Sequence, residues 1–325
     1  MKKSNDELMM ETMYWWGIPT LFRCKNDEDP KNCDIALVGV PHSTGNGTTE
    51  RDQHLGPRAV RHVSSAFRRV HLDFGINPWE SKIINDLGDV ALPEANNNEK
   101  CIEQITNFFS SIADAGKPVV SIGGDHSITG GILQGLSKKG SLLTKGKKIS
   151  LLQIDAHTDT YNQLDHFLGA KKSAAHWASY LVTQGIVDPK KSVQIGLRGN
   201  PRSLDWLQPS YDLGYNVITM DEFNKKGIEN VIKEILVNID DNPVYITFDL
   251  DSLDPSIAPA VSNLEPSFQG FSIDQAKKLI QSIKSKNIIG GDVVCLMPTK
   301  DNQNNITSMV AASIMFEIIS LLCLK

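Results

Sequence analysis

Six histidine and aspartate side chains follow three short apolar segments of the chain. They are His126, Asp155, His157, Asp159, Asp249 and Asp251. Within residues 155–159 and 249–251 they recur at every second position, and such side chains point the same way in an extended segment. Burying these carboxylates together would be costly unless a cation balanced their charge. Because mixed imidazole and carboxylate ligands suit Mn²⁺, Ni²⁺, Co²⁺ or Zn²⁺, we expect a site for a pair of divalent metal ions.

Each of the three groups also has a simpler interpretation when it is taken alone. His126 could be a core histidine, and residues 155–159 could form a helix cap or a turn. Residues 249–255 could be an aspartate-rich turn that ends at a proline. Turns do not explain why all three groups follow predicted strands, so the combination favours the metal site.

The segments that precede these groups are expected to be strands of one parallel sheet. Each is five to eight residues long, rich in Val and Ile, and lacks strict alternation, which is typical of strands buried on both faces. Ligands of such sheets bind at the carboxyl ends of the strands. The predicted strands are residues 35–40, 118–122, 149–154, 193–197, 244–248 and 288–295.

Helical segments are expected between and after these strands. Residues 101–115 and 274–285 have apolar side chains at helical spacing, and residues 306–324 are apolar with Thr307 as a candidate N-cap. The alternation predicts a three-layer α/β/α sandwich around a mainly parallel sheet. We expect a single domain over residues 34–325 and an N-terminal arm over residues 1–33.

Bulk properties exclude several classes of function. The 325 residues carry a net charge of −5 without a long block of one sign, so a nucleic-acid interface is not expected. Five scattered cysteines argue against a disulfide framework and for a reducing compartment. With no apolar run of about 18 residues and no signal peptide, we expect a cytoplasmic protein without a membrane span.

The three groups, in this order, resemble the ureohydrolase family of arginases and agmatinases, from about residue 35 to the C-terminus. A further similarity is the Gly-Pro-Arg step within residues 47–61. The resemblance implies two bridged metal ions, a small guanidino substrate that is hydrolysed to urea, and a homo-oligomer, usually a trimer or hexamer. It makes all six residues metal ligands, with Asp249 bridging and Asp159 also orienting the hydroxide. It makes His176 the candidate proton shuttle, with His166 as a rival.

Cys295 stands where most members of this family carry a glutamate that holds the substrate guanidinium. The thiol could simply be a small buried side chain at a strand end, or it could make room beside a small substrate. Thr48 and Thr49 are candidate replacement acceptors for the guanidinium.

This substitution, the loop at residues 42–57 and the aromatic arm at residues 14–19 resemble the guanidine hydrolase branch, which is associated with nickel. The arm could cover the site, form a subunit contact, or pack on its own domain. We therefore expect hydrolysis of free guanidine, a small substituted guanidine or a biguanide, with Ni²⁺ or Mn²⁺. The alternatives are an agmatinase or guanidinobutyrase, and a non-catalytic partner subunit that binds metal.

Overall fold

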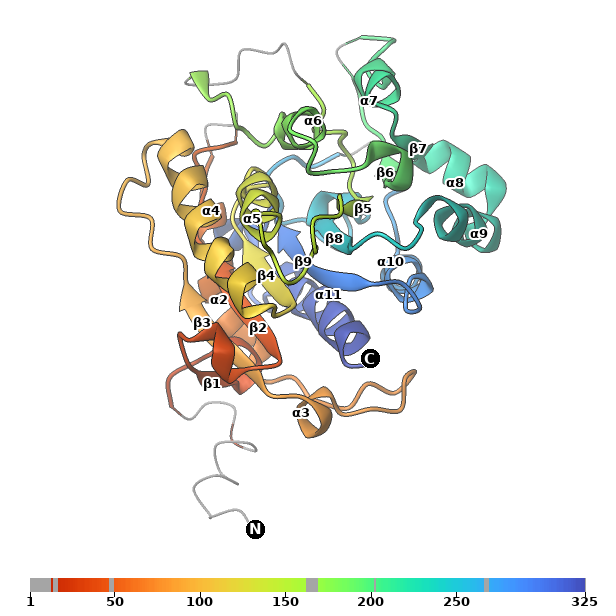
Figure 1. The fold of residues 1–325 in the computed structure, drawn as a ribbon. Helices are drawn as coiled ribbons and strands as arrows, with labels where there is room; N and C mark the ends of the chain where they lie inside the picture. The colour runs from red at the N-terminus through yellow and green to blue at the C-terminus, as the bar shows by residue number, and fades with distance from the viewer. Residues whose placement is uncertain are drawn as a thin grey trace.

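Nine parallel strands form one central sheet in the computed structural model, which describes residues 13, 17–46, 50–161, 169–201, 203–265 and 269–324 (Figure 1). The strand order across the sheet is β1-β3-β2-β4-β9-β8-β5-β6-β7. The strands are β1 (Lys25–Asn26), β2 (Ile35–Val40), β3 (Ile84–Asp89), β4 (Val119–Gly123), β5 (Ser150–Ile154), β6 (Val193–Leu197), β7 (Asn216–Thr219), β8 (Val244–Asp249) and β9 (Ile288–Val294).

Helices cover both faces of this sheet. The α-helices are α2 (Gly56–Ser64), α3 (Pro78–Ser81), α4 (Asn98–Ala115), α5 (Ile128–Leu136), α6 (Trp177–Thr183), α7 (Gln208–Leu213), α8 (Met220–Lys226), α9 (Ile228–Asn238), α10 (Ile273–Ser282) and α11 (Ile306–Leu322). The 3₁₀ helices are η1 (Leu21–Arg23), η2 (Pro30–Asn32), η3 (Gln53–Leu55), η5 (Pro189–Lys191), η6 (Leu250–Ser252) and η7 (Pro298–Lys300). One face packs on α2 and α8 to α11, and the other on α4, α5 and α6. The predicted three-layer sandwich is confirmed.

The two hydrophobic cores explain why the central strands lack an alternating pattern. In β2, Ile35 and Leu37 belong to the core under α11, whereas Ala36 and Val38 belong to the core under α4. All six residues of β2 are buried. A strand with a helix layer on each side needs apolar side chains on both faces, so its sequence is continuously apolar.

Three strands near the sheet edges, β1, β3 and β7, were not predicted from the sequence. Strand β3 lacks a continuous apolar run because it contains two polar residues, Asn85 and Asp86, which are almost fully buried. Asp86 accepts hydrogen bonds from Arg61 of α2, at 2.8 Å from Nε and 3.0 Å from Nη2. Hydrogen bonds from a helix that is distant in sequence offset the cost of burying Asp86, and the sequence of the strand alone does not predict these bonds.

The described part of the predicted N-terminal arm packs on the sheet. Strand β1 pairs with β3, and Leu21 and Phe22 are buried in the core. The aromatic residues 14–16 lie outside the described residues, so their covering role stays a prediction.

The predicted N-cap of the last helix is wrong. Asn305 precedes α11, whereas Thr307 lies inside it and its hydroxyl accepts from the Ala260 amide at 3.2 Å. The carboxylate of Asp301 serves the first turn instead, since it accepts from the amides of Thr307 and Ser308 at 3.0 and 2.8 Å. An aspartate six residues upstream does what the local pattern assigned to threonine.

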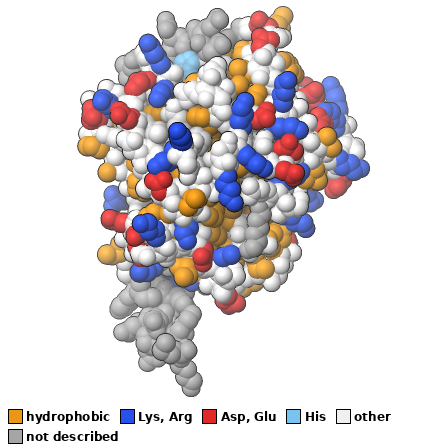
Figure 2. All heavy atoms as spheres, viewed as in Figure 1, with side chains coloured by type: hydrophobic (Ala, Val, Ile, Leu, Met, Phe, Trp, Pro, Cys, Tyr) orange, Lys and Arg blue, Asp and Glu red, His pale blue; other side chains and the backbone are white. Residues whose placement is uncertain are grey.

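Charged side chains of both signs occur on the surface. On the face shown in Figure 2, acidic and basic side chains are interspersed rather than gathered by sign. In the described ranges, no helix has both the length and the apolar character needed to cross a membrane.

Candidate metal centre

The predicted metal ligands lie at the carboxyl ends of three strands in the middle of the sheet. His126 follows β4, Asp155 directly follows β5, and Asp249 ends β8. Strand β9 lies between β4 and β8, and β5 pairs with β8, so the four strands are consecutive in the sheet. Because all are parallel, their carboxyl ends meet at one edge.

The first group of donor atoms converges on the His126 ring. Its Nδ1 atom lies 3.1 Å from Oδ2 of Asp155, 3.1 Å from Oδ2 of Asp159 and 3.2 Å from Oδ2 of Asp249. That nitrogen is buried and makes no hydrogen bond. Ligand atoms of His126, Asp155 and Asp159 all lie within 4.8 Å of one another. One nitrogen surrounded by carboxylate oxygens without a hydrogen bond is the arrangement that a shared cation would complete.

A second group adjoins the first and shares Asp155 with it. The Nδ1 atom of His157 lies 3.0 Å from Oδ2 of Asp251 and 3.7 Å from Oδ1 of Asp155. These three residues also offer ligand atoms within 4.8 Å of one another. Asp155 therefore presents one oxygen to each group, as a carboxylate between two neighbouring ions would.

The charges of the site fit cations as well as its geometry does. Burial, reinforced by the Asp249 carboxylate, raises the pKa of Asp251 to about 8. Burial and the charge of Asp155 likewise raise the pKa of Asp159. Both shifts show that the protein alone does not neutralise these carboxylates. Divalent cations would take the place of the protons, so the residues fit a metal pair.

A hydrogen-bond relay sets the tautomer of His126. Its Nε2 atom lies 2.8 Å from the hydroxyl of Thr247, and that hydroxyl donates to Oδ1 of Asp292 at 2.6 Å. Since the hydroxyl proton is committed to Asp292, Thr247 accepts the Nε2 proton of His126. With the Nε2 proton held by Thr247, Nδ1 is the nitrogen that would bind a metal ion, in place of the proton that the Asp155 charge favours by raising the pKa of His126.

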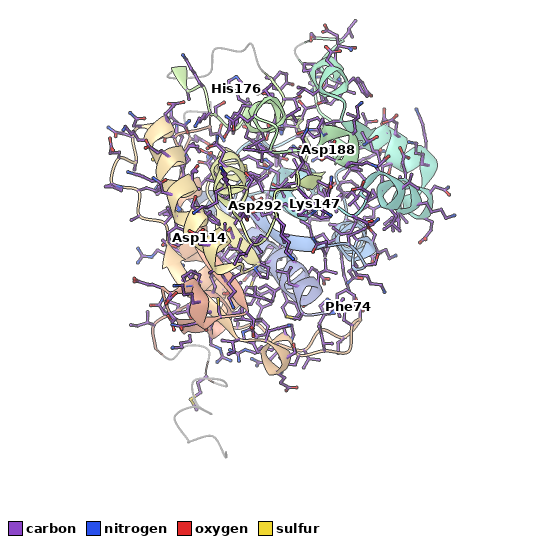
Figure 3. The ribbon with its side chains drawn as sticks, in the orientation of Figure 1. Phe74, Asp114, Lys147, His176, Asp188 and Asp292 are labelled. Atoms are coloured by element: carbon purple, nitrogen blue, oxygen red, sulfur yellow. The ribbon has the colours of Figure 1, made fainter. Side chains whose placement is uncertain are left out.

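Asp292 is a buried carboxylate that the sequence analysis did not single out. Its Oδ2 atom accepts from Thr129 at 2.9 Å and from Tyr245 at 3.0 Å. Figure 3 places Asp292 in the middle of the molecule, on the central sheet. Its distance along the chain from Thr247 and His126 explains why no local pattern indicated the relay.

Trp177 is a second residue that the sequence analysis missed. Its Nε1 donates to Oδ2 of Asp159 at 2.7 Å, and its ring centroid lies 4.9 Å from that of His126. Asp159 has a φ of 51°, a left-handed backbone conformation that is uncommon outside glycine. Trp177 thus restrains two of the predicted ligands from one buried position.

The candidate proton shuttle, His176, immediately precedes α6 and is mostly buried (Figure 3). Its Nδ1 lies 2.7 Å from the hydroxyl of Ser173. The amide of Ala178, two residues on, donates to the carbonyl oxygen of Asp159 at 3.1 Å, which ties the segment to the metal site. The rival His166 and the candidate contacts Thr48 and Thr49 lie outside the described residues.

Cys295 lies beside the metal site, just after β9. It is only 3 % exposed and has a φ of 70°. Burial, followed by the charges of Asp249 and Asp251, raises the pKa of the thiol well above its usual range. The thiol is therefore neutral and borders the predicted ligands. Asp254, the third aspartate of residues 249–255, is not among the proposed ligands. Its carboxylate accepts hydrogen bonds from the amide and hydroxyl of Ser256 and so caps a turn.

Comparison with known proteins agrees with this geometry. The arginase family model matches residues 33–320. The chain is 33% identical to the mitochondrial guanidino acid hydrolase of Homo sapiens over 93% of this chain and 82% of that protein. It is 32% identical to the guanidinopropionase of Pseudomonas aeruginosa over 94% and 92%. The structure of proclavaminate amidino hydrolase from Streptomyces clavuligerus superposes with a TM-score of 0.85, at 27% identity, over 95% and 98%. This protein belongs to the arginase family and is a ureohydrolase.

Proposed function

We propose that this enzyme hydrolyses a small guanidino compound to urea at a site for two divalent metal ions. The observation that carries the proposal is the pair of donor groups that share Asp155. The proposed ligands are His126, Asp155, His157, Asp159, Asp249 and Asp251. We propose Ni²⁺ or Mn²⁺ because both accept mixed imidazole and carboxylate ligands.

The chain's own residues supply the proton transfers. Bound divalent ions would act as Lewis acids that lower the pKa of an attacking water toward neutrality. Asp159, held at Oδ2 by the indole of Trp177, would orient that water and take its proton. The proton then goes to the leaving nitrogen as its bond to the guanidino carbon breaks, and His176 would exchange protons with solvent.

For the substrate we propose free guanidine, a small substituted guanidine or a biguanide. A longer substrate such as agmatine carries a second cation, which calls for an acidic partner at the pocket mouth. In the described parts of residues 199–209 and 262–269, the acidic residues are Asp205 and Glu265. Asp205 is exposed and bonds Ser203, whereas Glu265 lies 2.9 Å from Nε2 of His157. Glu265 is thus engaged by His157, and Asp205 is a single exposed carboxylate rather than an acidic cluster that would recognise a distant amine.

The loop before Thr48 and Thr49 reaches the same site. The Gly45 amide donates to Oδ2 of Asp125, the neighbour of His126, at 2.8 Å. The Gly45 carbonyl accepts from the Ala174 amide at 2.9 Å, close to His176 in sequence. These two anchors support our proposal that the following threonines contact the guanidinium.

Relatives of the chain support a second candidate function. Similar proteins include an agmatinase of Gallus gallus at 32% identity and a guanidinobutyrase of Pseudomonas aeruginosa at 30%. An agmatinase or guanidinobutyrase activity is therefore the alternative to a small substrate.

We expect kcat/KM for free guanidine to exceed that for agmatine by at least roughly tenfold, about 1.4 kcal/mol of transition-state discrimination. A compact cation needs no partner at the pocket mouth, whereas agmatine would bury its amine without one. The measurement is urea release from guanidine, agmatine, 4-guanidinobutanoate, arginine and metformin, after parallel loading with Mn²⁺ and Ni²⁺. Equal or better turnover of agmatine would favour the alternative and leave the metal site standing.

Replacing Cys295 with glutamate is expected to lower the rate on free guanidine by about tenfold or more. The new carboxylate would be buried beside Asp249 and Asp251, where it adds charge and takes up room. Cys295→Ser, which keeps the size and neutrality of the side chain, is the control and should retain most activity. Unchanged urea release by the glutamate variant would show that this position does not border the substrate.

We further propose that residues 34–325 form a single ureohydrolase domain. Residues 1–33 would be an N-terminal arm whose described part joins that domain through Leu21, Phe22 and β1. A homo-oligomer, either a trimer or a hexamer, and a cytoplasmic location are also proposed. Sedimentation of the metal-loaded protein would measure the oligomer size.

A further inference from the structure

We propose that Glu265 positions His157 and thereby holds one of the two metal ions selectively, an inference that rests on the proposed ligand set. Glu265 is not itself among the ligands. It belongs to the segment between β8 and α10, far along the chain from His157. Glu265 contacts the proposed metal centre only through His157.

The contact determines which nitrogen of His157 faces the metal site. The Nε2 atom lies 2.9 Å from Oε1 of Glu265, and the Nδ1 atom lies 3.0 Å from Oδ2 of Asp251. An ionised carboxylate only accepts hydrogen bonds, so the proton resides on Nε2. Nδ1, which lies next to Asp251, is then the nitrogen that would bind a metal ion in the second donor group. A carboxylate behind a histidine fixes the ring orientation and raises its basicity as a ligand.

The chain provides a seat for this carboxylate at Gly199. A Cβ at that position would lie 2.2 Å from Oε2 of Glu265 and 2.6 Å from its Cδ. Gly199 also has a φ of 109°, which side chains other than glycine rarely adopt. Only glycine leaves the space that the Glu265 carboxylate occupies beside His157.

Arg198, which precedes Gly199, also contacts the segment that follows β8. Arg198 donates to the carbonyl oxygens of Asp251 at 2.7 Å and Leu253 at 3.0 Å. The segment after β6 therefore supports two of the ligands. Arg198 binds the backbone of Asp251, and Gly199 leaves room for Glu265, which contacts His157. Both ligands belong to the second donor group.

The two histidines are supported by unlike groups. His126 is held through Thr247 and Asp292, both of which are fully buried. The side chains of Glu265 and His157 are 20 % and 26 % exposed, so the second support lies at the edge of the site. The residues that position His126 differ from the one that positions His157. Loss of either set should therefore weaken the binding of one metal ion and leave the other ion in place.

The test is metal stoichiometry and affinity of the full chain, measured by calorimetric titration with Mn²⁺ and with Ni²⁺ and by elemental analysis after dialysis. Glu265→Ala and Gly199→Ala are each expected to weaken one of the two ions by about 10–100-fold and to spare the other. Glu265→Gln, which can still accept from Nε2, should lose less. Leu264→Ala, a change at an exposed neighbour, is the matched control and should bind as the unaltered protein does.

Circular dichroism of each variant separates loss of metal from loss of fold, and Glu265→Ala provides the result if Gly199→Ala does not fold. Two ions bound with unchanged affinity in folded Glu265→Ala would overturn the inference and leave the proposed metal site intact. Equal weakening of both ions would overturn the selectivity. Failure of the unaltered protein to bind two ions would instead refute the ligand set on which the inference rests.

Discussion

Replacing Asp249 with asparagine is expected to remove at least one metal ion and to lower kcat/KM by at least roughly 10³-fold, about 4 kcal/mol. The Oδ2 atom of Asp249 lies 3.2 Å from Nδ1 of His126, within the first donor group. Its Oδ1 atom accepts from the amide of Asp251 at 2.9 Å, which orders the turn after β8. An amide keeps the size of the side chain but loses the charge that balances a cation.

The measurement is elemental analysis of the purified variant together with urea release. Asp254→Asn is the matched control, because Asp254 belongs to the same acidic segment yet caps a turn with Ser256. That variant should keep both ions and most activity. Full occupancy in Asp249→Asn would refute the assignment of Asp249 as a ligand.

Replacing Asp292 with alanine is expected to lower the free energy of unfolding by about 2–4 kcal/mol and to weaken metal binding. The change leaves the buried hydroxyls of Thr129, Tyr245 and Thr247 without their acceptor. The Thr247 hydroxyl is then free to donate to Nε2 of His126, which would move the imidazole proton to Nδ1. A protonated Nδ1 cannot bind a metal ion.

Denaturant unfolding and metal titration measure the two effects separately. Tyr245→Phe removes one hydrogen bond to Asp292 without touching the Thr247 relay. It should lose stability, by about 1 kcal/mol, and keep its metal affinity. If Asp292→Ala binds metal as tightly as the unaltered protein does, the Asp292 carboxylate stabilises the fold but does not position His126.

The buried strands of the sheet could be predicted from the sequence, and the edge strands could not. Strands β2 and β6 begin and end where the apolar runs predicted, since burial on both faces leaves a local signature. Strand β3 escaped because the charge of Asp86 is satisfied by Arg61, a contact between distant residues. The N-cap of α11 was misplaced for a similar reason, because Asp301 reaches the helix from outside the local pattern.

The candidate site divides along the same line. The predicted ligands stand at strand ends with spacings of two, which is a property of the local sequence, and the structure brings them into two adjoining groups. Their supports, including Trp177, Asp292 and Glu265, act through side chains that meet only in the folded protein. Sequence spacing contains no information about such meetings.

The position of β9 has a consequence for the order of assembly. It is the last strand of the chain, yet it lies between β4 and β8 in the middle of the sheet. Until it is added, β4 and β8 have open edges, and His126 is not joined through the sheet to the carboxylates after β5 and β8. The sheet therefore joins the donor atoms that follow β4 to those that follow β5 and β8 only when residues 288–294 have been added. A chain cut short before β9 would leave the edges of β4 and β8 unpaired, and such edges are prone to aggregation.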